Sequence, residues 1–329
     1  MTTTTNDTIS NQLIPFSTIV FALLGLVVPK MLLEGALPIF GFTLILTGVP
    51  HGAVDYFLFK QLRQQEGGNF SAIRFFGGYL LLIAAYIVVW NFAPTIAFLL
   101  FILVSAYHFG QSNWVSVRFS TNTLEKIVMS LWGLGIIGVP VLLHFGQAST
   151  IIYEMTGWQP GLSEVARASL VFLLVFSNLG LIIHLYNTRH INTDIFKHEI
   201  WKFMLLMLLF FTTPLMVGFG IYFVLWHSLS SMGHQIEVIR TSHPNFGIAS
   251  YLKQALPLSI MAFGGLGFLY FFFGHLFNEG QNLGVLFLFV SIITVPHTAL
   301  MEWLYRVGKP TLTQKDVEKR HRVDLKVIN

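Results

Sequence analysis

Apolar runs long enough to cross a bilayer recur along almost the whole chain, and short polar segments separate them. A spanning helix needs roughly 17–25 residues, and nearly every run has that length. Pro and Gly mark the breaks, for example at Ala93-Pro94 and, between the seventh and eighth runs, at Gly218 with Gly220. The pattern predicts an all-α, polytopic transmembrane bundle of about ten spans: 14–33, 36–59, 75–93, 95–116, 127–146, 166–187, 202–217, 218–238, 256–275 and 283–305.

The runs leave no room for a separate soluble domain, because every polar segment between them is short. Residues 1–13 are Thr-rich and polar, and we expect a disordered tail there. They contain no Lys or Arg, so they lack the basic start of a secretory signal. We therefore predict one transmembrane domain over 14–307, followed by a basic cytoplasmic tail over 308–329.

Composition supports a membrane protein and excludes thiol chemistry. Hydrophobic residues make up 54% of the chain and charged residues 10%, against about 25% charged in soluble domains. Mean hydropathy is +0.68. Cysteine is absent, which rules out disulfides, thiolate metal sites and cysteine nucleophiles. The net charge of +4 comes from loops and the tail, so it indicates membrane orientation and not a nucleic-acid partner.

Lys and Arg are distributed unequally between the two sides of the predicted bundle. Of the 19 basic residues, only Lys30 and Arg167 fall on the side opposite the termini. Cytoplasmic loops are enriched in Lys and Arg, so both termini are expected in the cytoplasm. The expected location is the inner (cell) membrane of a bacterium or an archaeon.

Histidines stand at a matched depth in four of the runs. His51, His108 and His297 each precede the basic residue that ends their run by nine or ten residues. That distance is about 14–15 Å along a helix, near the middle of a bilayer. His227 and His234 bracket the same level in the eighth run. Ionisable groups at this depth are costly and indicate function, although a single one often only hydrogen-bonds a neighbouring helix. Four at one level favour a shared metal site.

The candidate ligands indicate a metal that imidazole binds well. Imidazoles without thiols or an accompanying carboxylate suit zinc, copper, iron or nickel. Asp55 follows His51 by four residues, on the same helix face. We expect it to hold a ligand ring from outside the ligand set, with an interfacial carboxylate paired to a cation as the alternative.

Four motifs together resemble a known family: Gly48-Val49-Pro50-His51-Gly52-Ala53-Val54-Asp55, Tyr107-His108-Phe109-Gly110, Trp226-His227-Ser228 and Pro296-His297. In this order, over about residues 35–305, they are similar to the Brp/Blh integral-membrane β-carotene 15,15′-dioxygenases. The resemblance implies an enzyme that uses Fe²⁺ and O₂ to cleave the central double bond of β-carotene, or a related apolar polyene, into retinal. It implies iron ligands at His51, His108 and His227. A rhodopsin-type protein that receives the retinal is an expected partner.

The chain departs from the family at one position. The family has a second histidine four residues after the first in the Trp-His-Ser segment, and here that residue is Ser231. His297 is level with His51 and His108, so we predict it as the fourth ligand. His234 lies about 10.5 Å along the helix axis from His227, too far for easy sharing of one ion. We keep it as the alternative fourth ligand, and otherwise as a supporting residue.

Four aromatic residues near the histidines in sequence could contact the substrate. Tyr107, Trp114, Trp226 and Trp303 are candidate walls for the polyene, with ordinary helix packing as the alternative for each. A histidine-based transporter or proton relay is a second class, because Pro50 and Pro296 would break helices at mid-membrane. A diverged, non-cleaving carotenoid-binding paralogue is a third. Covalent retinal is disfavoured, because every lysine lies at the end of a run or outside one.

Overall fold

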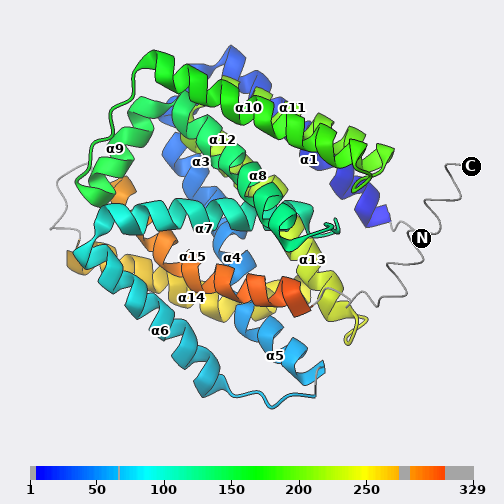
Figure 1. The fold of residues 1–329 in the computed structure, drawn as a ribbon. Helices are drawn as coiled ribbons and strands as arrows, with labels where there is room; N and C mark the ends of the chain where they lie inside the picture. The colour runs from blue at the N-terminus through cyan, green and yellow to red at the C-terminus, as the bar shows by residue number, and fades with distance from the viewer. Residues whose placement is uncertain (1–4, 66, 274–281, 308–329) are drawn as a thin grey trace, which may run out of the picture.

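Helices account for every regular element of the computed structural model, which describes residues 5–65, 67–273 and 282–307 (Figure 1). Two of the elements are π-helices, η1 (Leu44–Gly48) and η2 (Tyr222–Ser228). The α-helices are α1 (Thr5–Val27), α2 (Pro29–Glu34), α3 (Ala36–Thr43), α4 (Val49–Gly52), α5 (Asp55–Gln65), α6 (Ala72–Phe92), α7 (Pro94–Trp114), α8 (Asn122–Leu143), α9 (Phe145–Thr156), α10 (Glu164–Asn187), α11 (Thr193–Thr212), α12 (Leu215–Ile221), α13 (Leu229–Arg240), α14 (Ile248–Phe273) and α15 (Asn282–Val307).

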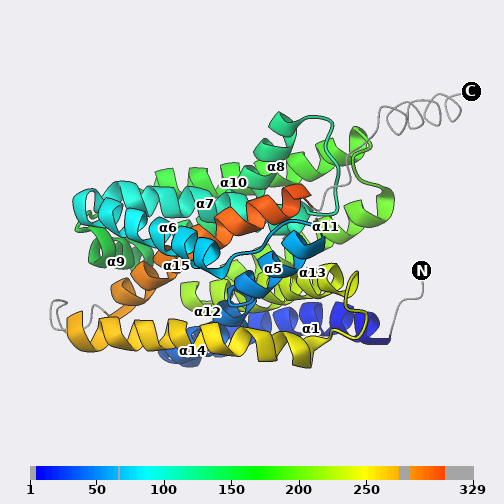
Figure 2. The ribbon, with the colours of Figure 1, turned by 90° about the horizontal axis from the view of Figure 1, so that it is seen from below.

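Seven helical stretches among the described residues are long and apolar enough to cross a membrane. Helices α1 and α14 run alongside them (Figure 2). The all-α class is therefore confirmed, whereas the count of ten spans stays a prediction. The seven are Ala36–Gln65, Ala72–Phe92, Pro94–Trp114, Asn122–Leu143, Glu164–Asn187, Leu215–Arg240 and Leu283–Arg306.

The break between the seventh and eighth predicted spans lies earlier than expected. It falls at Thr213-Pro214, where the Thr213 backbone is extended with φ −113° and ψ 153°. A residue before proline avoids the helical region, which explains the break. Gly218, expected to mark this break together with Gly220, lies inside α12. A Cβ on Gly218 would lie 2.6 Å from Thr213 Oγ1, so this glycine serves close packing.

The two ends of the chain were both predicted as polar tails. Helix α1 begins at Thr5, within the segment 1–13, whose disorder stays a prediction. The predicted tail over 308–329 lies outside the described residues. The start of α1 and the end of α15 lie toward the same end of the bundle in both ribbon views (Figures 1 and 2).

Helices α7 and α8 touch backbone to backbone. A Cβ on Gly133 would lie 1.7 Å from the carbonyl oxygen of Ala106, and one on Gly110 would lie 1.8 Å from that of Met129. Glycine is therefore required at both positions, as is common where membrane helices cross closely. This contact fixes the part of α7 that carries His108.

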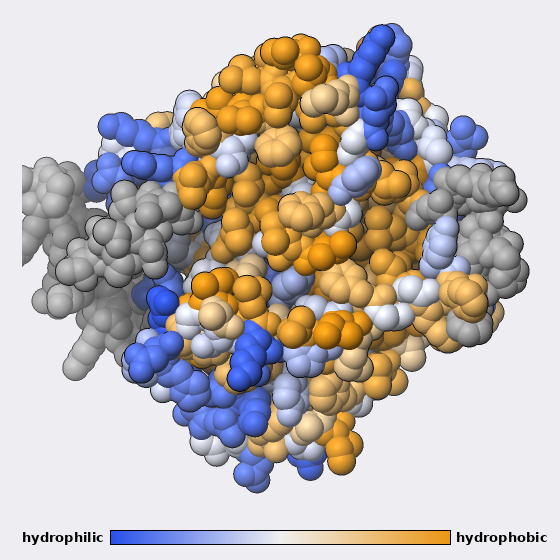
Figure 3. All heavy atoms as spheres, turned by 180° about the vertical axis from the view of Figure 1, so that it is seen from behind, coloured by the Kyte–Doolittle hydropathy of each residue, from blue (hydrophilic) through white to orange (hydrophobic). Residues whose placement is uncertain are grey.

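The outer surface carries many large apolar side chains. Large apolar side chains point outward, among them Ile73 at 86% exposure and Phe92 at 81%. Contiguous apolar surface of this kind is rare on soluble monomers. One face of the molecule is largely hydrophobic, with hydrophilic residues gathered toward its edges (Figure 3). The helices and this surface together are compatible with an integral membrane protein.

Candidate metal centre

Four buried histidines from four separate helical stretches converge on one point. The ligand nitrogens of His51, His108 and His227 all lie within 4.8 Å of one another. The His297 ring lies beside them, with centroids 5.0 Å from His51 and 5.2 Å from His108. The structure therefore brings together the four residues that the matched depth singled out.

Two of these rings are positioned by π-helices. The π-helix η1 ends at Gly48, just before α4 with His51, and η2 contains His227. A π-turn rotates the residues that follow it relative to a continuous α-helix, and such turns are frequent at functional sites. The two π-helices pack against each other. A Cβ on Gly48 would lie 2.8 Å from Phe223 Cε1, so only glycine admits the ring of η2 at this point.

Three of the four rings are held through Nδ1. His51 Nδ1 lies 2.5 Å from the Gly48 carbonyl oxygen, and His297 Nδ1 lies 3.0 Å from both Asp55 oxygens. His227 Nδ1 lies 3.0 Å from Ser112 Oγ, whose own proton is donated to the Phe109 carbonyl at 3.0 Å. Each Nδ1 therefore faces an acceptor and carries the hydrogen. In a neutral ring, Nε2 is then left with a free lone pair, as a metal ligand requires.

The unpaired nitrogens test whether a metal fits. Nε2 of His227, Nε2 of His297 and both ring nitrogens of His108 are buried without a hydrogen-bond partner. Buried polar atoms are nearly always paired, so several orphans at one point indicate a missing partner. A cation among the rings would satisfy one unpaired nitrogen on each of these three histidines, and an all-imidazole set suits zinc, copper, iron or nickel. The residues present fit a metal of this group.

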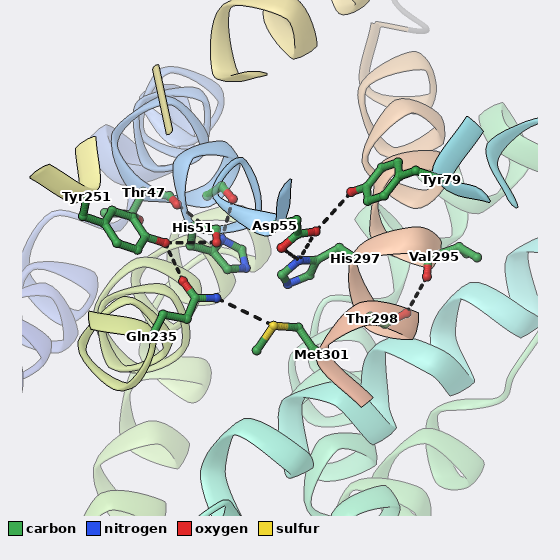
Figure 4. A network of polar contacts seen from close by, with 11 residues as sticks. Thr47, His51, Asp55, Tyr79, Gln235, Tyr251, Val295, His297, Thr298 and Met301 are labelled. Atoms are coloured by element: carbon green, nitrogen blue, oxygen red, sulfur yellow. Dashed lines mark hydrogen bonds and ion pairs between the residues drawn. The ribbon is translucent and has the colours of Figure 1, made fainter. Parts of the chain in front are cut away.

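Asp55 supports His297 and not the neighbouring His51. The α4 helix ends at Gly52 and α5 begins at Asp55, and this break turns the carboxylate toward α15. The Tyr79 hydroxyl donates to Asp55 Oδ2 at 3.2 Å (Figure 4). Tyr79, on α6, was not anticipated from the sequence, because nothing there ties a lone tyrosine in an apolar run to the site.

The far side of His51 is anchored by α14. The Tyr251 hydroxyl lies 3.1 Å from the His51 carbonyl oxygen and 2.6 Å from Gln235 Oε1 (Figure 4). The contact between Ser112 and His227 Nδ1 was also not anticipated from the sequence. Ser112 lies four residues after His108 and therefore on the same face of α7, which could have suggested that it lies near the site.

The alternative fourth ligand lies apart from the cluster. The His234 ring packs against Tyr305, with centroids 5.8 Å apart. Ser231, which stands where the family has a histidine, is buried, and its hydroxyl has no hydrogen-bond partner. Of the two candidates, the structure thus places His297, and not His234, beside the other three histidines.

An almost wholly apolar cavity of about 380 Å³ adjoins the histidines, and all four of them line it. Phenylalanines supply much of the remaining wall: Phe40, Phe98, Phe101, Phe109, Phe145, Phe219, Phe223 and Phe287. A cavity of this size and lining is typical of a site for an apolar small molecule.

The four aromatic residues predicted as walls do not line this cavity. The Tyr107 hydroxyl donates to Glu302 at 3.2 Å, and Trp226 Nε1 donates to Thr18 at 3.0 Å. Trp114 packs edge-on against Trp132, and Trp303 lies against Phe59. Helix packing, the alternative for each, describes their positions.

Comparison with known proteins identifies the family. Residues 42–305 match the sequence model described as β-carotene 15,15′-dioxygenase, so the chain belongs to that family. Among its curated relatives is the probable β-carotene 15,15′-dioxygenase Blh of Halobacterium salinarum, 23% identical over 288 residues, which cover 80% of this chain and 82% of the relative. Another is a β-carotene 15,15′-dioxygenase from uncultured marine bacterium 66A03, 26% identical over 271 residues, with coverage of 80% and 91%. No solved structure matches the chain.

Proposed function

We propose that this chain cleaves the central double bond of β-carotene with O₂ to give two molecules of retinal, with Fe²⁺ held by His51, His108, His227 and His297. One oxygen atom goes to each of the two carbons of the broken bond. The observation that supports this best is the convergence of three buried imidazoles, with the buried His297 ring beside them and several nitrogens unpaired, at an apolar cavity. Bound iron supplies the electron chemistry with O₂ that protein side chains lack.

The chain itself contributes binding, orientation and exclusion of water. Phenylalanine walls hold a polyene through buried area and aromatic contact. Gly48, Ser112 and Asp55 fix three of the imidazole rings through Nδ1. The nearly complete absence of polar lining keeps water from the reacting centre.

We further propose that the chain crosses the cell membrane ten times, with both termini in the cytoplasm and residues 14–307 forming one domain. The lengths of α1 (23 residues), α11 (20) and α14 (26) support spans beyond the seven apolar stretches. The basic asymmetry supports the orientation. β-Carotene would then arrive from the bilayer, and retinal would leave into it, for handover to a rhodopsin-type protein.

Expression in a β-carotene-accumulating bacterial host, followed by pigment extraction, tests the activity. The parent should bleach the cells and yield retinal, and a His108→Ala variant expressed to the same level should not. Metal analysis of the purified parent should find about one iron per chain. Carotenoid that copurifies without product would indicate a non-cleaving binding protein. A metal-free parent that binds no carotenoid would favour the transporter.

A further inference from the structure

The cavity is closed at the histidines. On α7, the lining residues Phe98, Phe101 and Ser105 precede His108, and on α15, Phe287 and Thr294 precede His297. The same order holds on α12 and η2, where the lining runs from Leu215 to His227. Among the described residues, none from α5, α13 or α14 lines the cavity. The four imidazoles therefore form its floor.

Helix α9 forms a fixed roof at the opposite end. Ala148, Ile151 and Ile152 of α9 line the cavity and are buried. The carboxylate of Glu154, on the same helix, accepts the backbone N–H of Gly284 in α15 at 2.8 Å. A Cβ on Gly284 would lie 2.7 Å from that of Glu154, so the two helices meet closely. This anchor leaves the roof little freedom to open.

One stretch of the wall is exposed. Leu99 is 47% exposed, Trp158 43% and Leu162 39%, although all three line the cavity. The other lining residues are buried or half-buried. Leu99 is on α7, and the other two lie in the segment 157–163 that joins α9 to α10. A residue that borders both the cavity and the surroundings marks an opening.

The α7 side of this opening is apolar, whereas exposed polar residues such as Gln159 and Ser163 lie on its other side. On α7, Ile96 is 57% exposed and Leu103 is 57% exposed, on either side of Leu99 along the chain. Surface of this kind faces hydrocarbon and not water in a membrane protein.

We propose that the gap between Leu99 of α7 and Trp158–Leu162 is a lateral door, through which a long apolar polyene enters from the bilayer and the cleaved products return to it. The inference rests on the proposed function for the identity of the occupant. The position of the door follows from the closed floor, the anchored roof and the exposed lining.

The cysteine-free chain allows the door to be blocked selectively. Leu99→Cys and Leu162→Cys place a single thiol at the door, and Ile96→Cys places one on the same face region of α7 but outside the cavity lining. Each variant is purified into lipid vesicles and treated with N-(1-pyrenyl)maleimide, a bulky apolar reagent. Retinal formation from β-carotene in the vesicles is then measured before and after labelling, together with iron content.

Labelling should lower kcat/KM by about tenfold or more in both door variants and by less than about twofold in Ile96→Cys, with iron unchanged in all three. Equal effects at Leu99→Cys and Ile96→Cys would overturn the door.

A second measurement does not depend on cleavage. β-Carotene in the vesicles should slow the maleimide reaction of Leu99→Cys and leave that of Ile96→Cys unchanged. If this protection appears but no retinal forms, the door stands and the proposed reaction fails. If retinal forms without protection or blockage, the reaction stands and the door is wrong.

Discussion

Replacing Asp55 by Asn isolates the contact that holds His297. Both carboxylate oxygens lie 3.0 Å from His297 Nδ1, and Oδ2 also accepts from the Tyr79 hydroxyl. Asparagine replaces one of these oxygens by an NH₂ group, which lies beside the His297 Nδ1–H in either orientation because both positions are 3.0 Å from that nitrogen. Leaving a buried donor unpaired costs about 1–3 kcal/mol, and losses of this kind weaken metal binding by about 10–100-fold. We expect iron affinity to fall by that factor, or about 1.4–2.7 kcal/mol.

The assay is competition for Fe²⁺ between the purified protein and a chelator of known affinity, under anaerobic conditions. Tyr79→Phe is the matched control, because it removes one donor and leaves the contact to His297 intact, and its affinity should stay within about threefold of the parent. Parent-like affinity in Asp55→Asn would refute the idea that this carboxylate holds a ligand ring. Equal losses in Asp55→Asn and Tyr79→Phe would show that packing, and not the contact with His297, is responsible.

The fourth ligand, the contact between α7 and α8, and the topology can each be tested separately. His297→Ala should empty the site of iron while the protein stays in the membrane, whereas His234→Ala should retain iron and lose at most about 10–100-fold in turnover, as metal analysis and retinal assays will show. Gly133→Ala drives a methyl group into the Ala106 carbonyl and should cost more than about 3 kcal/mol, seen as a lower thermal midpoint in detergent, whereas Gly146→Ala, which meets nothing within 4 Å, should be harmless. Reporter fusions should place both ends of the chain in the cytoplasm, and an external C-terminus would contradict the ten-span arrangement.

The shared level of the histidines along the bundle could be predicted from the sequence, because the distance from a histidine to the next basic residue fixes its level along a helix. That is why the approach of His297 to His51 and His108 was anticipated. Rotation about the helix axis could not be predicted in the same way. Asp55 shares a face with His51 only if the helix is continuous, and the break after Gly52 sends it to His297 instead.

The same limit explains the wall residues. In a run that is apolar on every side, no periodicity tells the cavity face from the lipid face. Trp226 therefore looked like a wall next to His227, but it hydrogen-bonds Thr18 of α1. The misplaced span boundary has a different cause. Gly218 was interpreted as a helix breaker, but it is a contact residue, and Pro214 provides the break.

The proposed door has a kinetic consequence, because substrate and products would share it. In the proposed reaction, both retinal molecules would occupy the space that the next polyene needs, so turnover would wait until they have left. Retinal should act as a competitive inhibitor, and the rate at steady state should depend on how readily the surrounding lipid, or a retinal-binding neighbour, drains product from the door. The steady-state rate of such an enzyme would therefore depend on how fast retinal is removed from the surrounding membrane as much as on the concentration of carotenoid there.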